Sequence, residues 1–129
     1  DQLRRNIFRR SKDAYLMDHQ VLKLTIKGME LGHDRQLEPI ERAFFYMPMQ
    51  HSESIKVQDF SVQTFTTLAE TVKPTLRASF RTFGQFAELH RDIVAQFNRF
   101  PHRNEVLGRE NTPEEEAYLN ESPPDFGQT

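Results

Sequence analysis

Three of the five histidines occupy positions where polar side chains could gather and do chemistry. His51 follows a predicted helix in "QHSE", His90 interrupts an apolar helical stripe in "ELHRDIV", and His102 lies in "RFPHRN". Because imidazole titrates near neutral pH, two of these histidines, or His51 with Glu53, could serve as general acid and base. A histidine on an apolar face is more often a buried, neutral residue that bonds a backbone carbonyl. The sequence leaves both interpretations of His90 open.

The same histidines lack the spacing that is typical of a metal site. Zinc sites commonly use ligands in short, closely spaced pairs, and His51, His90 and His102 form no such pair. The chain has no cysteine, which excludes a disulfide, a thiolate metal site and a cysteine nucleophile. It also lacks a Gly-x-Ser-x-Gly motif, a phosphate-binding glycine loop and a dinucleotide fingerprint. The sequence therefore predicts neither a metal nor a cofactor.

Arginines surround the last of these histidines. Arg99, Arg103 and Arg109 could hold an anion through their paired N–H donors. They could equally join the end of a long helix to the acidic run Glu114–Glu116. Asn104 could cap a short turn or face a pocket. The residue types thus allow either an anion site or a set of structural ion pairs.

Charge is unevenly distributed along a chain whose net charge is −2. Residues 73–109 have seven basic and three acidic side chains, whereas residues 110–129 have six acidic side chains and no basic one. This pattern fits a basic pocket that an acidic tail partly covers, and it also fits an ordinary solvated surface. Glu53 could orient His51 or simply favour the positive start of a helix. The near-neutral total argues against a nucleic-acid partner, because non-specific binding depends on neutralising phosphates.

The elements that must position these residues are helices. Apolar residues recur at helical spacing, and no alternating runs flank a hairpin dipeptide. Gly32 and Asn98 are suited to the left-handed conformation that ends a helix, and Pro48 should break or kink the second helix. Ser52 and Thr112 are well placed to cap helices. The predicted helices cover residues 18–31, 39–47, 53–72 and 75–97, and a last one begins at 113.

The expected fold is all-α, with antiparallel helix pairs in one domain over residues 1–120 and an irregular tail over 121–129. A chain of 129 residues can bury a core of its own. No apolar run approaches the roughly 20 residues that span a bilayer, and the basic start lacks the apolar core of a signal peptide. Together with the absence of cysteine, these features favour a cytoplasmic protein without a membrane partner.

Four motifs occur in order along nearly the whole chain: "DQLRRNIFR", "PIERAFFYMPMQHSE", "HRDIVAQFNRFPHRN" and "LGRENTPEEEAYL". In these blocks the chain resembles a mainly bacterial family, domain of unknown function 924. The resemblance implies a tetratricopeptide-like array or bundle of helix pairs. It also implies that this chain lacks a segment that members usually have before the first motif. Leu3-Arg4 stands where members have Phe-Pro, and Ser54 stands where they have an acid.

The motif blocks contain the polar residues that we take as candidate ligand contacts. We expect a helical binding or adaptor domain whose polar, partly cationic pocket takes a small anionic molecule or an acidic peptide group. The alternatives are a hydrolase or transferase that uses histidine and glutamate as acid and base, and a structural role in which these residues join helix ends. The oligomeric state stays open, a homodimer included. The candidate contacts are Arg5, Asn6, His51, Glu53, His90, Arg91, His102, Arg103 and Asn104.

Overall fold

Helices account for all of the regular structure in residues 1–127, the part of the chain that the computed structural model describes. No strand occurs in that part, which confirms the predicted all-α fold. None of its helices is long and apolar enough to cross a membrane. The α-helices are α1 Gln2–Ile7, α2 Asp18–Glu30, α3 Pro39–Gln50, α4 Ile55–Thr71, α5 Arg77–Phe97, α6 Asn104–Leu107 and α7 Pro113–Asn120. The 3₁₀ turns are η1 Lys12–Ala14, η2 His33–Gln36, η3 Pro74–Leu76 and η4 Pro101–Arg103.

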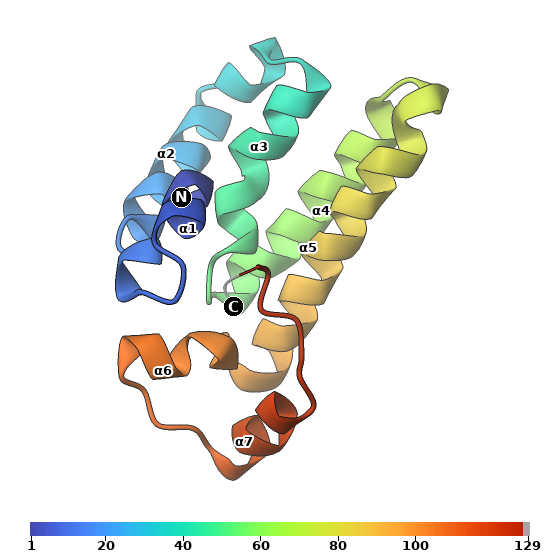
Figure 1. Cartoon of the computed structure of the whole chain (residues 1–129). Helices are drawn as coiled ribbons and strands as arrows, with labels where there is room; N and C mark the ends of the chain where they lie inside the picture. Colours follow the sequence, from blue (N-terminus) through green and yellow to red (C-terminus); the bar gives the residue numbers. More distant parts are fainter. Residues whose placement is uncertain (128–129) are drawn as a thin grey trace.

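The helices from α2 to α5 run alternately up and down and pack side by side in chain order (Figure 1). α4 and α5 form the longest hairpin of the molecule. α1 lies beside α2, and α6 and α7 lie below the lower end of α5. After α7 the chain runs back along α5 toward the lower ends of α3 and α4. Segments that are distant in sequence therefore meet at this lower end.

Local signals set most of the helix ends. Asn98 has a φ of 58° and Gly108 a φ of 68°, and both end helices in the left-handed conformation. Thr112 and Glu115 form the predicted capping box of α7. Gly32 likewise has a left-handed φ of 74° where α2 stops. Gly32, Asn98 and Thr112 therefore confirm the helix boundaries that the sequence predicts at these positions.

Two predicted boundaries were wrong. α3 continues through Pro48 to Gln50, because a proline in the last turn removes one hydrogen bond without ending the helix. α4 begins at Ile55 with Ser54 as its N-cap residue, so Ser52 is not the cap. The hydroxyl of Ser52 instead accepts a hydrogen bond from the Ser54 N–H at 3.1 Å. His51 and Ser52 thus lie in a tight connection between two helices.

The apolar core has two parts. The larger part lies between α3, α4 and α5, where Tyr46, Phe65 and Phe80 are almost completely buried. The smaller part surrounds Phe100 at the lower end and includes the half-buried Phe126. Residues 121–127 form no helix, and residues 128–129 lie outside the described part. The tail nevertheless packs on the domain through Phe126.

Candidate functional site

The three histidines meet at the lower end of the molecule. His51 ends α3, His90 lies on the inner face of α5, and His102 belongs to η4. The ring centroids of His51 and His90 are 6.1 Å apart. The Phe100 ring lies between the other two, 5.7 Å from His90 and 5.6 Å from His102. The turn that begins at Asn98 brings η4 back against α5, so His90 and His102 become neighbours of the same Phe100 ring.

Two of the imidazoles are oriented by hydrogen bonds at Nδ1. His51 Nδ1 lies 2.5 Å from Asp1 Oδ2, and His90 Nδ1 lies 2.6 Å from the Phe86 carbonyl oxygen. A carbonyl only accepts, so His90 Nδ1 carries the proton and donates it. His102 Nδ1 is buried without a hydrogen-bond partner among residues 1–127. The site therefore contains two fixed rings and one ring with unused polar capacity.

Burial keeps all three imidazoles neutral. It lowers the pKa of His51 well below 6.5, and the guanidinium groups of Arg5 and Arg103 lower it further. Burial also lowers the pKa of His90 to about 3. For His102, burial and the charge of Arg103 lower the pKa to about 4. These three imidazoles therefore add no positive charge to the site at neutral pH.

Arg103 is the most deeply placed of these arginines. Its side chain is almost fully buried, and its guanidinium carbon lies 4.6 Å from the Tyr15 ring centroid and 4.5 Å from that of Phe100. Nη2 donates to the His51 carbonyl at 3.0 Å. Nε is buried and has no partner among the described residues. Although burial lowers the pKa of Arg103 to about 10, the group stays charged at neutral pH.

A carboxylate of α2 is shared by two arginines. Arg5 binds Asp18 through two parallel hydrogen bonds of 2.6 and 2.5 Å. Arg103 Nη1 lies 3.8 Å from the same carboxylate, too far for a hydrogen bond. Arg5 and Arg103 are both buried. Asp18 is thus a carboxylate that two buried guanidinium groups share.

The Glu53 carboxylate, just before α4, holds the start of η4 close to the start of that helix. Its Oε2 accepts the Phe100 N–H at 2.6 Å, and Arg109 donates to both of its oxygens at 2.9 and 3.1 Å. Burial alone would raise the pKa of Glu53, but the bonds from Arg109 and Phe100 lower it below its usual value. Glu53 makes no contact with His51 that orients the imidazole; Asp1 occupies that role. Glu53 is thus committed to an ion pair.

A cavity of about 320 Å³ opens between α2, the end of α3 and η4. Its polar walls come from residues that are far apart in the sequence and include three of the predicted contacts. His90 and His102 lie outside its wall, on the side of Phe100 and Phe126. The lining residues that carry polar groups or charge are Tyr15, Asp18, His19, His51, Ser52, Glu53 and Arg103.

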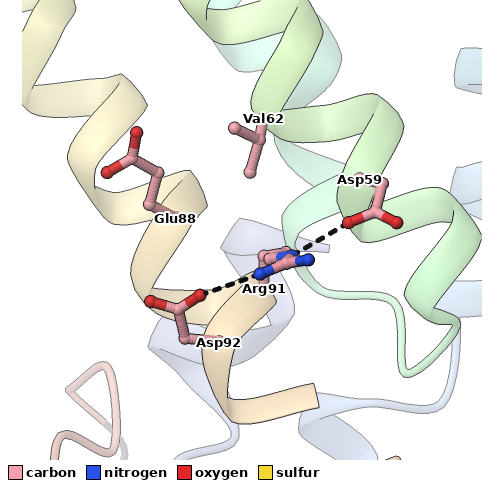
Figure 2. Close-up of a pocket in the computed structure, with 5 residues that line it drawn as sticks. All are labelled: Asp59, Val62, Glu88, Arg91 and Asp92. Carbon is pink, nitrogen blue, oxygen red and sulfur yellow. Dashed lines mark hydrogen bonds and ion pairs between the residues drawn. The ribbon is translucent and has the colours of Figure 1, made fainter. Parts of the chain in front are cut away.

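Arg91 lies outside this region. Figure 2 shows it between α4 and α5, where it binds Asp59 at 2.9 Å and Asp92 at 3.3 Å on an exposed surface. Successive helical residues point about 100° apart, so the burial of His90 turns its neighbour Arg91 outward. Asn6 is exposed on α1 and accepts a hydrogen bond from Gln2 at 3.3 Å. Neither residue reaches the cavity.

Asn104 is fully buried, and its side chain makes hydrogen bonds that stabilise the fold. Its amide donates to Asn111 at 2.8 Å, and its oxygen accepts from Arg109 at 2.9 Å. Arg99 binds Glu115 through bonds of 2.8 and 2.6 Å, which is the predicted junction between α5 and the last helix. The arginines of this stretch therefore have two different roles. Arg99 and Arg109 hold the fold, and Arg103 faces the cavity.

Two comparisons with known proteins show the family of the chain and a similar solved structure. The family model described as "Bacterial protein of unknown function (DUF924)" matches residues 1–123. The chain belongs to this family. The solved structure of the protein of unknown function ATU0120 from Agrobacterium tumefaciens is 37% identical to it, with a TM-score of 0.79. The match covers 94% of this chain and 62% of that one. No curated protein matches the chain.

Sequence reasoning missed several residues of this candidate site. Asp18 is the first residue of α2, and its carboxylate binds Arg5. Tyr15 carries no motif, although an aromatic residue beside a buried arginine is a common arrangement. Asp1 lies in the first motif block and could have been noticed there. No group of three or more potential ligand residues among residues 1–127 could hold a metal ion.

Proposed function

We propose that this DUF924 chain is a binding domain whose cavity between α2, α3 and η4 holds the anionic group of a small molecule or an acidic peptide. Arg103 is the anchor of that group. Tyr15 and His51 form the neighbouring walls. The proposal concerns this chain, which covers 62% of the related solved structure.

The burial of Arg103 and its incomplete set of hydrogen bonds are the main support for the proposal. A buried cation is costly unless carboxylates or other acceptors compensate it. Arg103 lacks a close carboxylate of its own, and its Nε donor is unused among the described residues. A carboxylate or phosphate oxygen would supply the missing acceptor, and charge-assisted bonds from arginine are about twice as strong as neutral ones.

One contact favours a second candidate, a hydrolase or transferase. The Asp1 carboxylate at His51 Nδ1 resembles the pairing that orients a catalytic imidazole, and Ser52 lines the same cavity. A general base works best when its pKa lies near the working pH. Because burial lowers the pKa of His51 well below that range, the binding role is the better supported one. Hydrolysis of ester or phosphate substrates that is lost in His51→Gln would favour the second candidate.

The binding proposal is tested by titrating the full chain with inorganic phosphate and with succinate in a calorimeter. We expect binding that weakens with salt and drops about tenfold or more in Arg103→Gln, the effect of losing one charged hydrogen bond. Arg91→Gln is the matched control, because Arg91 is an exposed arginine outside the cavity. Equal affinity of the wild type and Arg103→Gln would refute the role of Arg103.

Arg103→Gln also removes packing against two rings, so a second variant protects the test against misfolding. Asp18→Asn keeps the side-chain shape and removes the carboxylate that Arg5 and Arg103 share. We expect tighter anion binding in this variant. Unchanged or weaker binding in a folded Asp18→Asn protein would contradict the proposal.

A further inference from the structure

The tail of the chain covers the histidine side of the site. Residues 121–127 return from α7 along α5 (Figure 1), and the Phe126 ring stacks on His90 with a centroid distance of 3.8 Å and an interplanar angle of 18°. The same ring meets His102 at 5.6 Å and Phe100 at 6.3 Å. His90, His102 and Phe100 therefore form a receptor for one flat aromatic ring.

The residue before Phe126 brings a negative charge to the same place. The charge of Asp125 acts on His102, where it opposes the lowering of the pKa, and on Tyr15, where it supports the raised pKa of the phenol. Tyr15 lines the cavity and stacks on Arg103. Asp125 and Phe126 thus place an acidic group and an aromatic ring at two adjoining parts of the site.

The tail conformation is not one that its own sequence prefers. Phe126 has a φ of 57° and Ser122 a φ of 52°, and the left-handed region is disfavoured for a bulky residue such as phenylalanine. Pro123 and Pro124 restrict the backbone of the segment between Ser122 and Phe126. The contacts of Phe126 with the domain therefore hold the tail, rather than local preference. A ligand with the same groups and no such strain could replace it.

From these observations we propose that residues 123–127 are an intramolecular ligand and that the site binds peptide segments in which an acidic residue directly precedes an aromatic one. The aromatic side chain occupies the place of Phe126 against His90, and the carboxylate occupies the place of Asp125 near Tyr15 and His102. This inference rests on the proposed function, because it narrows the class of anionic ligand to an acidic aromatic peptide. The tail then competes with any partner peptide.

The test uses the full chain and a fluorescent peptide of the tail sequence SPPDFG, amidated at its end so that its only carboxylate is that of aspartate. Fluorescence anisotropy measures its binding to the wild type and to Phe126→Ala. A tethered segment acts at an effective concentration in the millimolar range. We therefore expect the peptide to bind Phe126→Ala at least tenfold more tightly than the wild type.

Peptide variants test the two groups separately. Peptides with the Asp125→Asn or the Phe126→Ala change should bind the Phe126→Ala protein at least tenfold more weakly than the parent peptide. The protein variant Phe126→Tyr keeps a ring and should behave like the wild type. In NMR spectra, the ring protons of His90 should shift in Phe126→Ala and return toward their original positions when the peptide binds.

Two outcomes overturn the inference: the parent peptide fails to bind Phe126→Ala, or it binds both proteins equally. Phosphate titration of the same Phe126→Ala protein separates this failure from failure of the proposed function. If phosphate binds in an Arg103-dependent manner and the peptide does not bind, only the inference fails. If the peptide binds with the same affinity to Phe126→Ala and to Phe126→Ala/Arg103→Gln, the role of Arg103 fails while the aromatic site stands.

Discussion

Acidification from pH 7 to pH 5 should destabilise this domain strongly, because the folded state holds its histidines neutral. The pKa of His90 is lowered to about 3 and that of His102 to about 4, against about 6.5 in an unfolded chain. As the pH falls below about 6.5, the unfolded chain takes up protons that the folded chain cannot take up. Stability therefore falls with pH across this window and levels off only near the folded pKa values.

The size of the effect follows from the two pKa values. Between pH 7 and pH 5, a histidine with a folded pKa of about 3 or 4 lowers the free energy of unfolding by about 2 kcal/mol. The two together give about 4 kcal/mol, a large share of the roughly 5–15 kcal/mol that holds a typical domain. For 129 residues this corresponds to a fall in Tm of about 15 °C.

Urea denaturation at pH 7, 6 and 5, followed by circular dichroism, measures this loss. The lowered pKa values of Glu53 and Glu115 do not interfere, because stability from a depressed carboxyl pKa is lost only below about 4.5. His90→Gln should make the loss smaller by about 2 kcal/mol. Gln96→Ala, an exposed change on the same helix, should leave it intact. A difference below about 1 kcal/mol between pH 7 and pH 5 in the wild type would refute the buried, neutral histidine cluster.

Three further predictions concern stability at neutral pH, each measured by urea denaturation. Glu53→Gln should lower the free energy of unfolding by about 2 kcal/mol because it breaks a partly buried, bidentate ion pair, whereas Asp59→Asn, in an exposed pair, should lower it much less. Similar losses in the two variants would show that the Glu53 pair is solvated. Asn98→Val should cost about 1–2 kcal/mol and Asn98→Gly almost nothing, because the backbone is left-handed there; equal costs would exclude that conformation. Thr112→Ala should cost about 1 kcal/mol through loss of the helix cap, and an unchanged stability would mean that the capping box does not form.

Features that depend on neighbours in sequence were predictable. The capping box at Thr112 and the left-handed end at Asn98 need only local conformational preferences, and the structure contains both. The outward position of Arg91 was also within reach, because it follows from the helical period once His90 is placed inside. The boundary at Pro48 failed because a proline that removes one bond can be tolerated in a last turn that tertiary packing supports.

Features that depend on which carboxylate meets which guanidinium were beyond sequence reasoning. Arg99 was expected near the acidic residues of the last helix and binds Glu115 there, but Arg109 reaches back to Glu53, 56 positions earlier. Ion pairs of this kind are set by the three-dimensional arrangement of helices, for which the periodicity of one chain gives no distances. The position of Phe126 was also beyond sequence reasoning, because its ring stacks on His90, which is distant in the sequence.

The pairing of charges explains why one arginine among four is suited to a ligand. Arg5, Arg99 and Arg109 each bind a carboxylate through two hydrogen bonds, to Asp18, Glu115 and Glu53 respectively.

Arg103 is as deeply buried as Arg5, yet it has two aromatic faces and a backbone carbonyl in place of a carboxylate of its own. Cation–π contacts compensate a buried charge by about 2 kcal/mol, less than the several kcal/mol that desolvation costs. A domain that needed this residue only to join helices would gain stability from an apolar side chain of similar size. An acidic group that a ligand brings to Arg103 supplies the compensation that the fold itself withholds.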